Sequence, residues 1–323
     1  MPKLDLSNAI EINGLANKHL PKSMWTRMAD ITEGARLDTD FNAKWLAEWW
    51  YLNGKVRLVS MNGEQKDLGF FVVVGHIESV EGLALPVEFS DSPVEFSNLL
   101  HFYGLYSQDD IPPIISYTET YVPRSTIEDY VGLRTPYVDF KYYFDNDKVR
   151  MHGSGLNGYK LTYIPHNSGL AMEICFRPRM IKTIDQADYP LPFNTYERAY
   201  GSLSGTISLE GKKYRIIPSK SEGYFDHMMS RSLNEIWTRE FHGWNWLEVT
   251  TESYQAILYA IRSLEDGYDR YSFKKLTILD KRTGRIMAEY FGDDVQIVET
   301  NWEDWIEDTS YNLNVARNFI NFT

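Results

Sequence analysis

The side chains best suited to proton transfer lie within residues 222–229, which read Glu-Gly-Tyr-Phe-Asp-His-Met-Met. Successive side chains of a strand face opposite sides, so Tyr224 and Asp226 would share one face, and Phe225 and His227 the other. This arrangement sets a phenol beside a carboxyl group. Because burial among apolar rings disfavours the carboxylate, an aspartate in such surroundings could keep the proton that a weakly basic C=C bond requires.

Tryptophans at the same spacing of two residues would supply those rings. Trp50 follows Glu48 by two positions, and Trp246 follows Trp244 in the same way, so each pair would lie on one face of a strand. We expect these rings to line a pocket, where a desolvated aromatic face stabilises a cation by about 1 to 2 kcal/mol. Core packing is the alternative for the tryptophans, and the residue types alone favour it.

Two carboxyl groups have a second interpretation. Asp226 could cap a turn after its strand, with His227 as hydrogen-bond partner, instead of donating a proton. Glu48 is either a buried acceptor that ties the two halves of the chain together, which we favour, or a second catalytic carboxyl. The expected substrate-binding residues are Trp50, Glu48, His227, Trp244 and Trp246.

Two motifs resemble those of other enzyme classes, but the residues in and around them do not support the corresponding function. Gly153-Ser-Gly-Leu-Asn-Gly158 has the spacing of a dinucleotide-binding loop, but residues 159–164 alternate like a strand. No helix would hold a phosphate there, so the sequence predicts a glycine-rich turn between strands. Gly201-Ser-Leu-Ser-Gly205 places a leucine where a serine hydrolase needs its nucleophile.

The sequence gives no signal for a metal or a cofactor, and we expect none. The seven histidines include no pair at helical metal-ligand spacing. The single cysteine, Cys175, excludes an intramolecular disulfide, and its apolar neighbours predict a buried, inert thiol. Residues 1–20 mix charged with apolar side chains, which argues against a signal peptide. We therefore expect a cytoplasmic protein.

Composition narrows the class of partner. The 33 basic and 45 acidic residues give a net charge of −12, which opposes binding to nucleic acid or to anionic membranes. No stretch approaches the roughly 20 apolar residues of a membrane-spanning helix, so stable membrane insertion is not expected. Aromatic residues make up 15% of the chain and suit pleated sheets and apolar pockets. A hydrophobic small molecule is the expected partner, and the oligomeric state stays open.

Short strands joined by glycine turns dominate the chain. Three β-hairpins are predicted, at residues 55–74, 205–217 and 276–291, with turns at Asn62-Gly63, Glu210-Gly211 and 280–284. Further alternation occurs at residues 138–144, 159–164, 170–176 and 254–262. This pattern predicts an all-β barrel or sandwich. Short helices are expected at residues 24–31, 96–102 and 125–131, and a last strand or short helix within residues 300–323.

The chain resembles the AttH-type proteins and carotenoid 1,2-hydratases. The resemblance rests on Glu-Trp-Trp-Tyr at residues 48–51, Ser-Gly-Thr at 204–206, Gly-Tyr-Phe-Asp at 223–226 and Trp-Asn-Trp at 244–246. It implies two consecutive lipocalin-like antiparallel β-barrel or sandwich domains. With a proline-containing connection within residues 182–198, this gives an N-terminal extension at 1–40 and domains at 41–190 and 191–323.

The resemblance also implies a function. In the hydratases that the chain is similar to, a Tyr-x-Asp pair supplies the acid, so Asp226 would donate the proton and Tyr224 would orient it or relay a proton. The expected activity is that of a cofactor-free lyase or isomerase, which hydrates or cyclises a C=C bond of a polyene or isoprenoid. Two alternatives stay open: a pericyclase of the lipocalin-like Diels-Alderase type in natural-product biosynthesis, and a non-catalytic binder of a lipophilic ligand.

Overall fold

The computed structural model describes most of the chain from residue 47 onward, namely residues 47–78, 96–107, 114–132, 137–155, 157–179, 184–185, 193–230, 244–262, 271–304 and 316–321. Nearly all of these residues lie in strands, which confirms the predicted all-β class. Contacts divide the chain into two compact units, Met1–Thr238 and Arg239–Thr323. Each unit is described by itself below.

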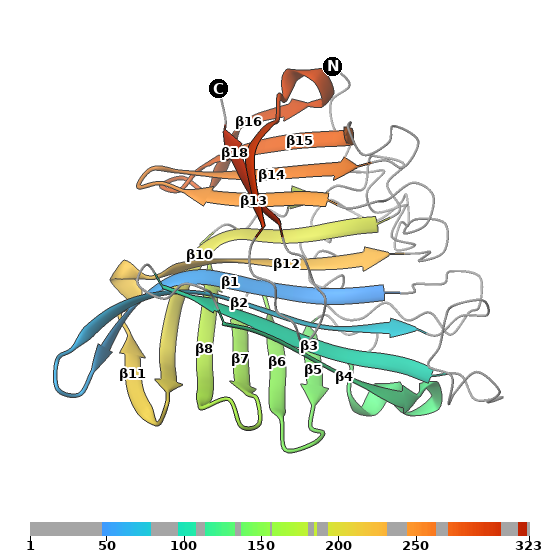
Figure 1. Cartoon of the computed structure of the whole chain (residues 1–323), viewed down its shortest axis with the longest axis vertical. Coiled ribbons are helices and arrows are strands. Elements are labelled where there is room, and N and C mark those ends of the chain that lie inside the picture. Colours follow the sequence, from blue (N-terminus) through green and yellow to red (C-terminus); the bar gives the residue numbers. More distant parts are fainter. Residues whose placement is uncertain are drawn as a thin grey trace. The chain divides into compact units, whose positions relative to one another are not determined.

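The first unit contains a 12-stranded antiparallel sheet that forms a β-barrel. Its strands are β1 (Ala47–Ser60), β2 (Gln65–Glu78), β3 (Phe96–Tyr106), β4 (Ile114–Pro123), β5 (Val138–Tyr142), β6 (Lys148–Ser154), β7 (Gly158–Ile164), β8 (Leu170–Pro178), β9 (Ile184–Asp185), β10 (Phe193–Leu209), β11 (Lys212–Ile216) and β12 (Glu222–Ser230). Neighbours follow the order β4-β3-β2-β1-β11-β10-β8-β7-β6-β5, and β12 pairs with β1 and β10. In Figure 1, β1 to β4 cross the direction of β5 to β8, as the rolled sheet requires.

Glycine turns set the register of the predicted hairpins, and all three are confirmed. β1 and β2 meet at Asn62-Gly63, where Gly63 has a φ of +82°, and β10 and β11 meet at Glu210-Gly211. Left-handed backbone of this kind matches the twist of two-residue hairpins. The loop that ends at Gly158 joins β6 to β7, as the sequence predicted, and no helix follows it.

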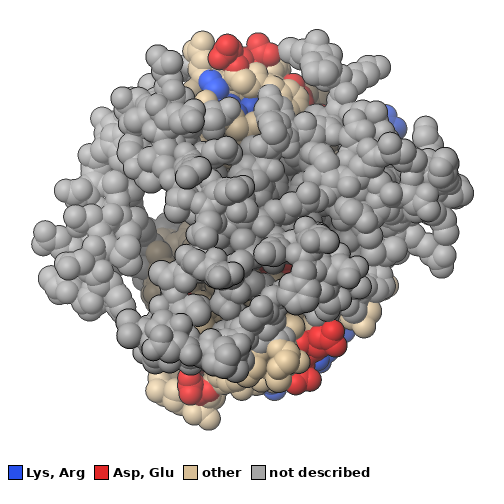
Figure 2. Space-filling model, turned by 90° about the vertical axis from the view of Figure 1, so that its right-hand side faces the viewer, with Lys and Arg blue, Asp and Glu red and all other residues tan. Residues whose placement is uncertain are grey.

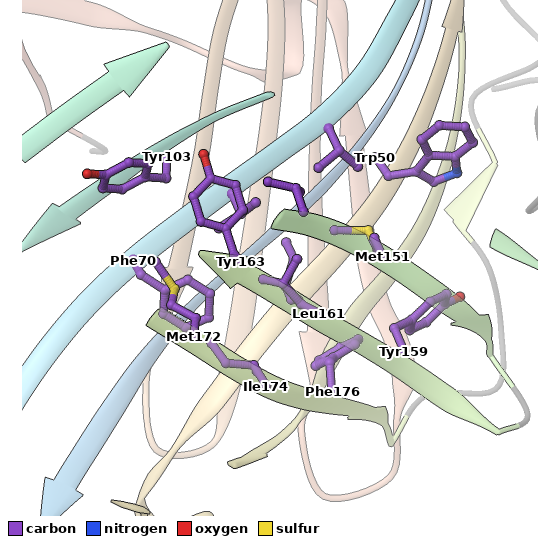
Figure 3. Close-up of a cluster of buried hydrophobic side chains, with 14 of the residues drawn as sticks. Trp50, Phe70, Tyr103, Met151, Tyr159, Leu161, Tyr163, Met172, Ile174 and Phe176 are labelled. Carbon is purple, nitrogen blue, oxygen red and sulfur yellow. The ribbon is translucent and has the colours of Figure 1, made fainter. Parts of the chain in front are cut away.

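Alternation along the strands fills the barrel with one set of side chains. On β1, the core residues are Trp50, Leu52, Val56 and Leu58, all at even positions. Figure 3 shows side chains of β1, β6, β7 and β8, among them Trp50 and Met151, gathered in the same interior. Since these residues are almost fully buried, their burial is the main force that holds the barrel together.

The sheet's end strands, β4 and β5, are linked by the 3₁₀ helix η3 (Arg124–Asp129) and the residues after it. Val131 forms an isolated bridge with Phe140 of β5, so this segment covers the edge of β5. Ile127 and Val131 turn into the core. The helix predicted at residues 125–131 is therefore present as a single short 3₁₀ segment.

The second unit contains a four-stranded sheet and a separate pair of strands. The sheet has the order β13 (Trp244–Thr250), β14 (Tyr254–Arg262), β15 (Tyr271–Asp280) and β16 (Arg285–Phe291), and η6 (Gly292–Asp294) follows it. The pair consists of β17 (Val298–Asp304) and β18 (Ala316–Asn321), so the closing segment contains strands. None of the helices among the described residues is long and apolar enough to span a membrane.

Several expectations differ from the structure. The helix predicted at residues 96–102 is wrong, because this segment pairs with β2 and β4 as part of β3. Cys175 is half-buried rather than buried, because it alternates with the core residues Ile174 and Phe176 on β8. The strands from Phe193 to Ser230 hydrogen-bond to β1 and β8 and lie in the first unit, and the division into domains at 41–190 and 191–323 stays a prediction. The helix expected at 24–31 lies outside the described residues.

Charged residues of both signs lie close together on the surface. In Figure 2, the visible acidic and basic residues adjoin one another at both ends of the view. Arg57 binds Asp67, and Lys212 binds Glu64, all of them on exposed or half-exposed positions near the β1–β2 hairpin. Because water and salt screen exposed pairs of this kind, they do not decide the fold.

Candidate functional site

The register of β1 with β12 sorts the expected site residues onto two faces. Trp50 pairs with His227, and Tyr51 pairs with Asp226. Directly paired residues of an antiparallel ladder project to the same side. Trp50 and His227 therefore face the barrel interior, whereas Tyr51 and Asp226 face away from it, on what we call the outer face.

The interior side holds a buried carboxyl group between two histidines. Oε2 of Glu48 lies 3.0 Å from Nε2 of His76, and Oε1 lies 3.9 Å from Nε2 of His227. The ring of Trp50 stacks on that of His227, with centroids 4.9 Å apart, and also contacts Phe140. All of these polar side chains are fully buried. Glu48 is thus a buried acceptor for His76 within the first unit, and its expected role in tying the two halves of the chain together stays a prediction.

The outer face holds the Tyr-x-Asp pair. Tyr224 is fully buried and Asp226 is 4% exposed, although neither belongs to the barrel core. Asn53 pairs with Tyr224 across the ladder, and its Nδ2 donates a hydrogen bond to the hydroxyl of Tyr51 at 3.2 Å. The face thus combines a carboxyl group, two phenols and an amide in two ladder pairs, Tyr51 with Asp226 and Asn53 with Tyr224, which are neighbours on this face.

A continuous row of aromatic rings leads away from this pair over five neighbouring strands. Centroids are 6.2 Å apart from Tyr224 to Tyr51, 6.1 Å from Tyr51 to Phe71, 5.9 Å from Phe71 to Phe102 and 6.2 Å from Phe102 to Tyr117. We call these five residues the ring row. Burial decreases along it, from the fully buried Tyr224 to Tyr117, which is 56% exposed.

A glycine makes room for the centre of the ring row. Gly104 of β3 pairs with Phe71, and a Cβ atom built on Gly104 would lie 2.2 Å from the Phe71 ring. The ring therefore occupies the space that a side chain at position 104 would fill. This contact fixes Phe71 between Tyr51 and Phe102.

On the outer face of the first unit, the described rings next to the Tyr-x-Asp pair are those of Tyr51 and Phe71. Trp50 and His227 lie on the opposite face, and Glu48 accompanies them. Trp246, half-buried, and Trp244 lie on β13 of the second unit, opposite Tyr259 and Ile261. The sequence reasoning missed Tyr51, Phe71 and Phe102, although Tyr51 shares the odd-position face of β1 with Asn53.

A second polar network lies inside the barrel, and no motif in the sequence predicted it. Nε2 of His101 lies 3.1 Å from Oδ2 of Asp147, and Nδ1 lies 2.7 Å from the hydroxyl of Tyr163. Burial lowers the pKa of His101, against the opposing effect of Asp147, and burial raises the pKa of Tyr163. A neutral His101 that donates to Asp147 from Nε2 and accepts from Tyr163 at Nδ1 satisfies all three groups.

The described part of the chain contains no cluster of side chains that could hold a metal ion. No group of three or more histidine, cysteine, aspartate or glutamate residues there has a geometry suited to a metal ion. The absence of metal and cofactor that the sequence led us to expect stays a prediction. The arrangement on the outer face can, by itself, hold an apolar molecule against rings and present a carboxyl group to it.

No protein-family model and no curated protein sequence matches the chain. Among solved structures, it is similar to a protein assigned to AttH from Nitrosomonas europaea, with a TM-score of 0.57 and 15% identity over 84% of this chain and 76% of that one. It is also similar to CghA, solved with Sch210972, with a TM-score of 0.50 and 12% identity over 76% of this chain and 60% of that one. Kievitone hydratase from Nectria haematococca matches with a TM-score of 0.46 and 12% identity over 86% and 75%. The first of these similarities confirms the AttH-like, lipocalin-like fold.

Proposed function

We propose that this AttH-like chain is a cofactor-free enzyme that transfers a proton from Asp226 to a C=C bond of a hydrophobic polyene or isoprenoid. The observation that carries the proposal is the burial of Asp226, 4% exposed, at the buried end of the ring row. A carboxyl group withheld from water on an aromatic surface favours its protonated, proton-donating form.

Each step of the reaction has a residue to carry it. The π electrons of the alkene take the proton of Asp226, which forms a C–H bond, a carbocation and the Asp226 carboxylate. Tyr51 and Tyr224 present rings to the cation from the same face. Water then adds and returns a proton to Asp226, which gives hydration. Attack by a second C=C bond followed by loss of a proton gives cyclisation instead.

Solvent labels test the proposal on substrates of the proposed class. Farnesol, squalene and parinaric acid would be incubated with the protein in D₂O and in H₂¹⁸O, and the products would be weighed by mass spectrometry. Protonation adds one non-exchangeable deuterium, and hydration also adds one labelled oxygen. Asp226→Asn should abolish turnover and leave the binding of fluorescent parinaric acid unchanged, whereas the exposed control Asp67→Asn should change neither. Full turnover by Asp226→Asn would exclude Asp226 as the acid.

The ring row also supports a pericyclase as a second candidate. Five rings in contact can hold a linear polyene in one folded shape, and positioning alone accelerates a cycloaddition. The product would then be an isomer without deuterium, and Asp226→Asn would cost little activity. Binding of parinaric acid without conversion of any of the three compounds would instead support a lipophilic carrier.

A further inference from the structure

The barrel has a seam where its end strands meet. Among the described residues, the outer edge of β5 is held by backbone hydrogen bonds from Gly132 to the carbonyl of Asp139 and from Lys141 to the carbonyl of Tyr130, each 2.7 Å long. Adjacent strands elsewhere in the sheet share ladders of up to thirteen residue pairs, as between β1 and β2. The described part of the seam, residues 124–132 and 137–142, is thus joined by fewer backbone bonds than the neighbouring ladders.

Side chains centred on His101 cross this seam. His101 lies on β3, Asp147 in the turn between β5 and β6, and Tyr163 on β7. The ring of Tyr142, from β5, meets that of His101 edge-on at 4.4 Å. Asp147 also accepts a hydrogen bond from the backbone N–H of His166, which fixes its carboxylate. One imidazole therefore holds together parts of the barrel that are far apart in the sequence.

We propose that Asp147, His101 and Tyr163 form an acid-sensitive latch, and that protonation of His101 opens the barrel at the seam. Protonation turns Nδ1 from an acceptor into a donor, so the hydroxyl hydrogen of Tyr163 loses its partner. In an open state the imidazole is hydrated and protonates at its ordinary pKa of 6.5, whereas in the closed state its pKa is lower because it is buried. Acid therefore favours the open state, by up to tenfold per pH unit between the two pKa values.

Among the ionisable groups that contact each other here, His101 is the one that takes up a proton between neutral and mildly acidic pH. Asp147 is the carboxylate that faces it, and Tyr142, Tyr163 and Tyr103 are phenols whose pKa is raised by burial. From β2, Val74 pairs with His101, and His76 lies two residues further along with Glu48 as its partner. From β4, Thr118 is the ladder partner, and η3 contributes Ile127. His76 and His227, which both face Glu48, are thus further buried histidines among the described residues of the interior, and the experiment has to separate them from His101.

Hydrogen exchange of the full chain, read by mass spectrometry at about pH 7.5 and about pH 5 and corrected for intrinsic rates, tests the latch. We expect peptides of residues 124–142 to lose protection in acid by about tenfold or more, ahead of peptides from β7 and β8. In His101→Asn this dependence on pH should vanish, whatever the protection at neutral pH. In the control His152→Asn, a half-exposed histidine of β6, the dependence should persist.

Asp147→Asn provides a second test that a loss of stability cannot imitate. It removes the charge that raises the pKa of His101 in the closed state, so that pKa should fall further and the loss of protection should continue to a lower pH before it levels off. A purely structural role predicts more opening at every pH, with the pH dependence levelling off where it does in the unmodified chain. Equal protection of the seam at both pH values, or a pH dependence that survives in His101→Asn, would overturn the latch. A loss that begins in β1 and β2 would assign the effect to His76.

Discussion

Trp50 and Asp226 lie on neighbouring strands one register position apart, yet they face opposite sides of the sheet. Trp50 pairs with His227 and stacks on its ring, and the next residue, Tyr51, pairs with Asp226. Since side chains alternate along a strand, one step separates the barrel core from the proposed site. The two residues should therefore respond to substitution in different ways.

Trp50→Ala should destabilise the first unit without removing the proposed chemistry. Trp50 is fully buried and contacts Phe140 and His227, so truncation leaves a cavity that costs about 3 to 5 kcal/mol. Urea unfolding gives the loss, and parinaric acid binding per folded molecule should stay unchanged at low temperature. Tyr143→Ala, at a half-exposed position on the same barrel, should change stability by less than about 0.5 kcal/mol. A stable Trp50→Ala that fails to bind would place Trp50 in the site instead.

Gly104→Ala should weaken ligand binding through Phe71. The new methyl group would occupy the position of the Phe71 ring, so the ring has to leave its place between Tyr51 and Phe102. The loss of one or two ring contacts, about 0.5 to 1.5 kcal/mol each, predicts parinaric acid binding weaker by roughly 2- to 10-fold. Fluorescence titration measures it, with the fully exposed Met61→Ala as control. Unchanged affinity in Gly104→Ala would remove the ring row from the binding surface.

The strands were predictable because alternation and glycine turns are local signals. The turn at Asn62-Gly63 fixes β1 against β2, and the hairpin follows from a dozen residues. The pairing of Tyr51 with Asp226 joins residues 175 positions apart, and no local pattern sets that register. The alternation within each strand was predicted correctly. The pairing between distant strands, which decides whose side chains share a face, could not be predicted from the sequence. For this reason Trp50 was expected beside Asp226, whereas Tyr51 pairs with it in the fold.

The network around His101 was hidden for the same reason. His101, Asp147 and Tyr163 come from three separate segments, and each looks ordinary in its own sequence context. The segment around His101 even favoured a helix, because Phe96 to Phe102 lacks a clear polar alternation. It is a strand in the fold because pairing with β2 and β4 outweighs local preference.

Glu48 and His76 should show strong energetic coupling. Both side chains are fully buried and share a 3.0 Å hydrogen bond, so Glu48→Ala leaves the imidazole without this acceptor and costs about 1 to 3 kcal/mol. Glu48→Gln keeps an acceptor oxygen and should cost less. A double-mutant cycle with His76→Phe, followed by urea unfolding, should give a coupling energy of about 0.5 to 3 kcal/mol. Additive effects would show that the bond contributes nothing to stability.

Stability should fall as the pH drops below 6.5, and His101 should account for part of the fall. The pKa of this buried imidazole is lowered in the folded chain, so between that value and 6.5 the unfolded chain binds the proton and the folded chain does not. The free energy of unfolding therefore rises with pH across this window. It no longer changes with the titration of His101 above pH 6.5, where both states are deprotonated, or below the folded pKa, where both are protonated. Urea midpoints at half-unit steps from about pH 8 to about pH 4 measure it. His101→Asn should reduce the dependence of the unfolding free energy on pH within the window. The control His152→Asn, at a half-exposed position, should reduce it less. An unaltered dependence in His101→Asn would show that other groups govern the acid response.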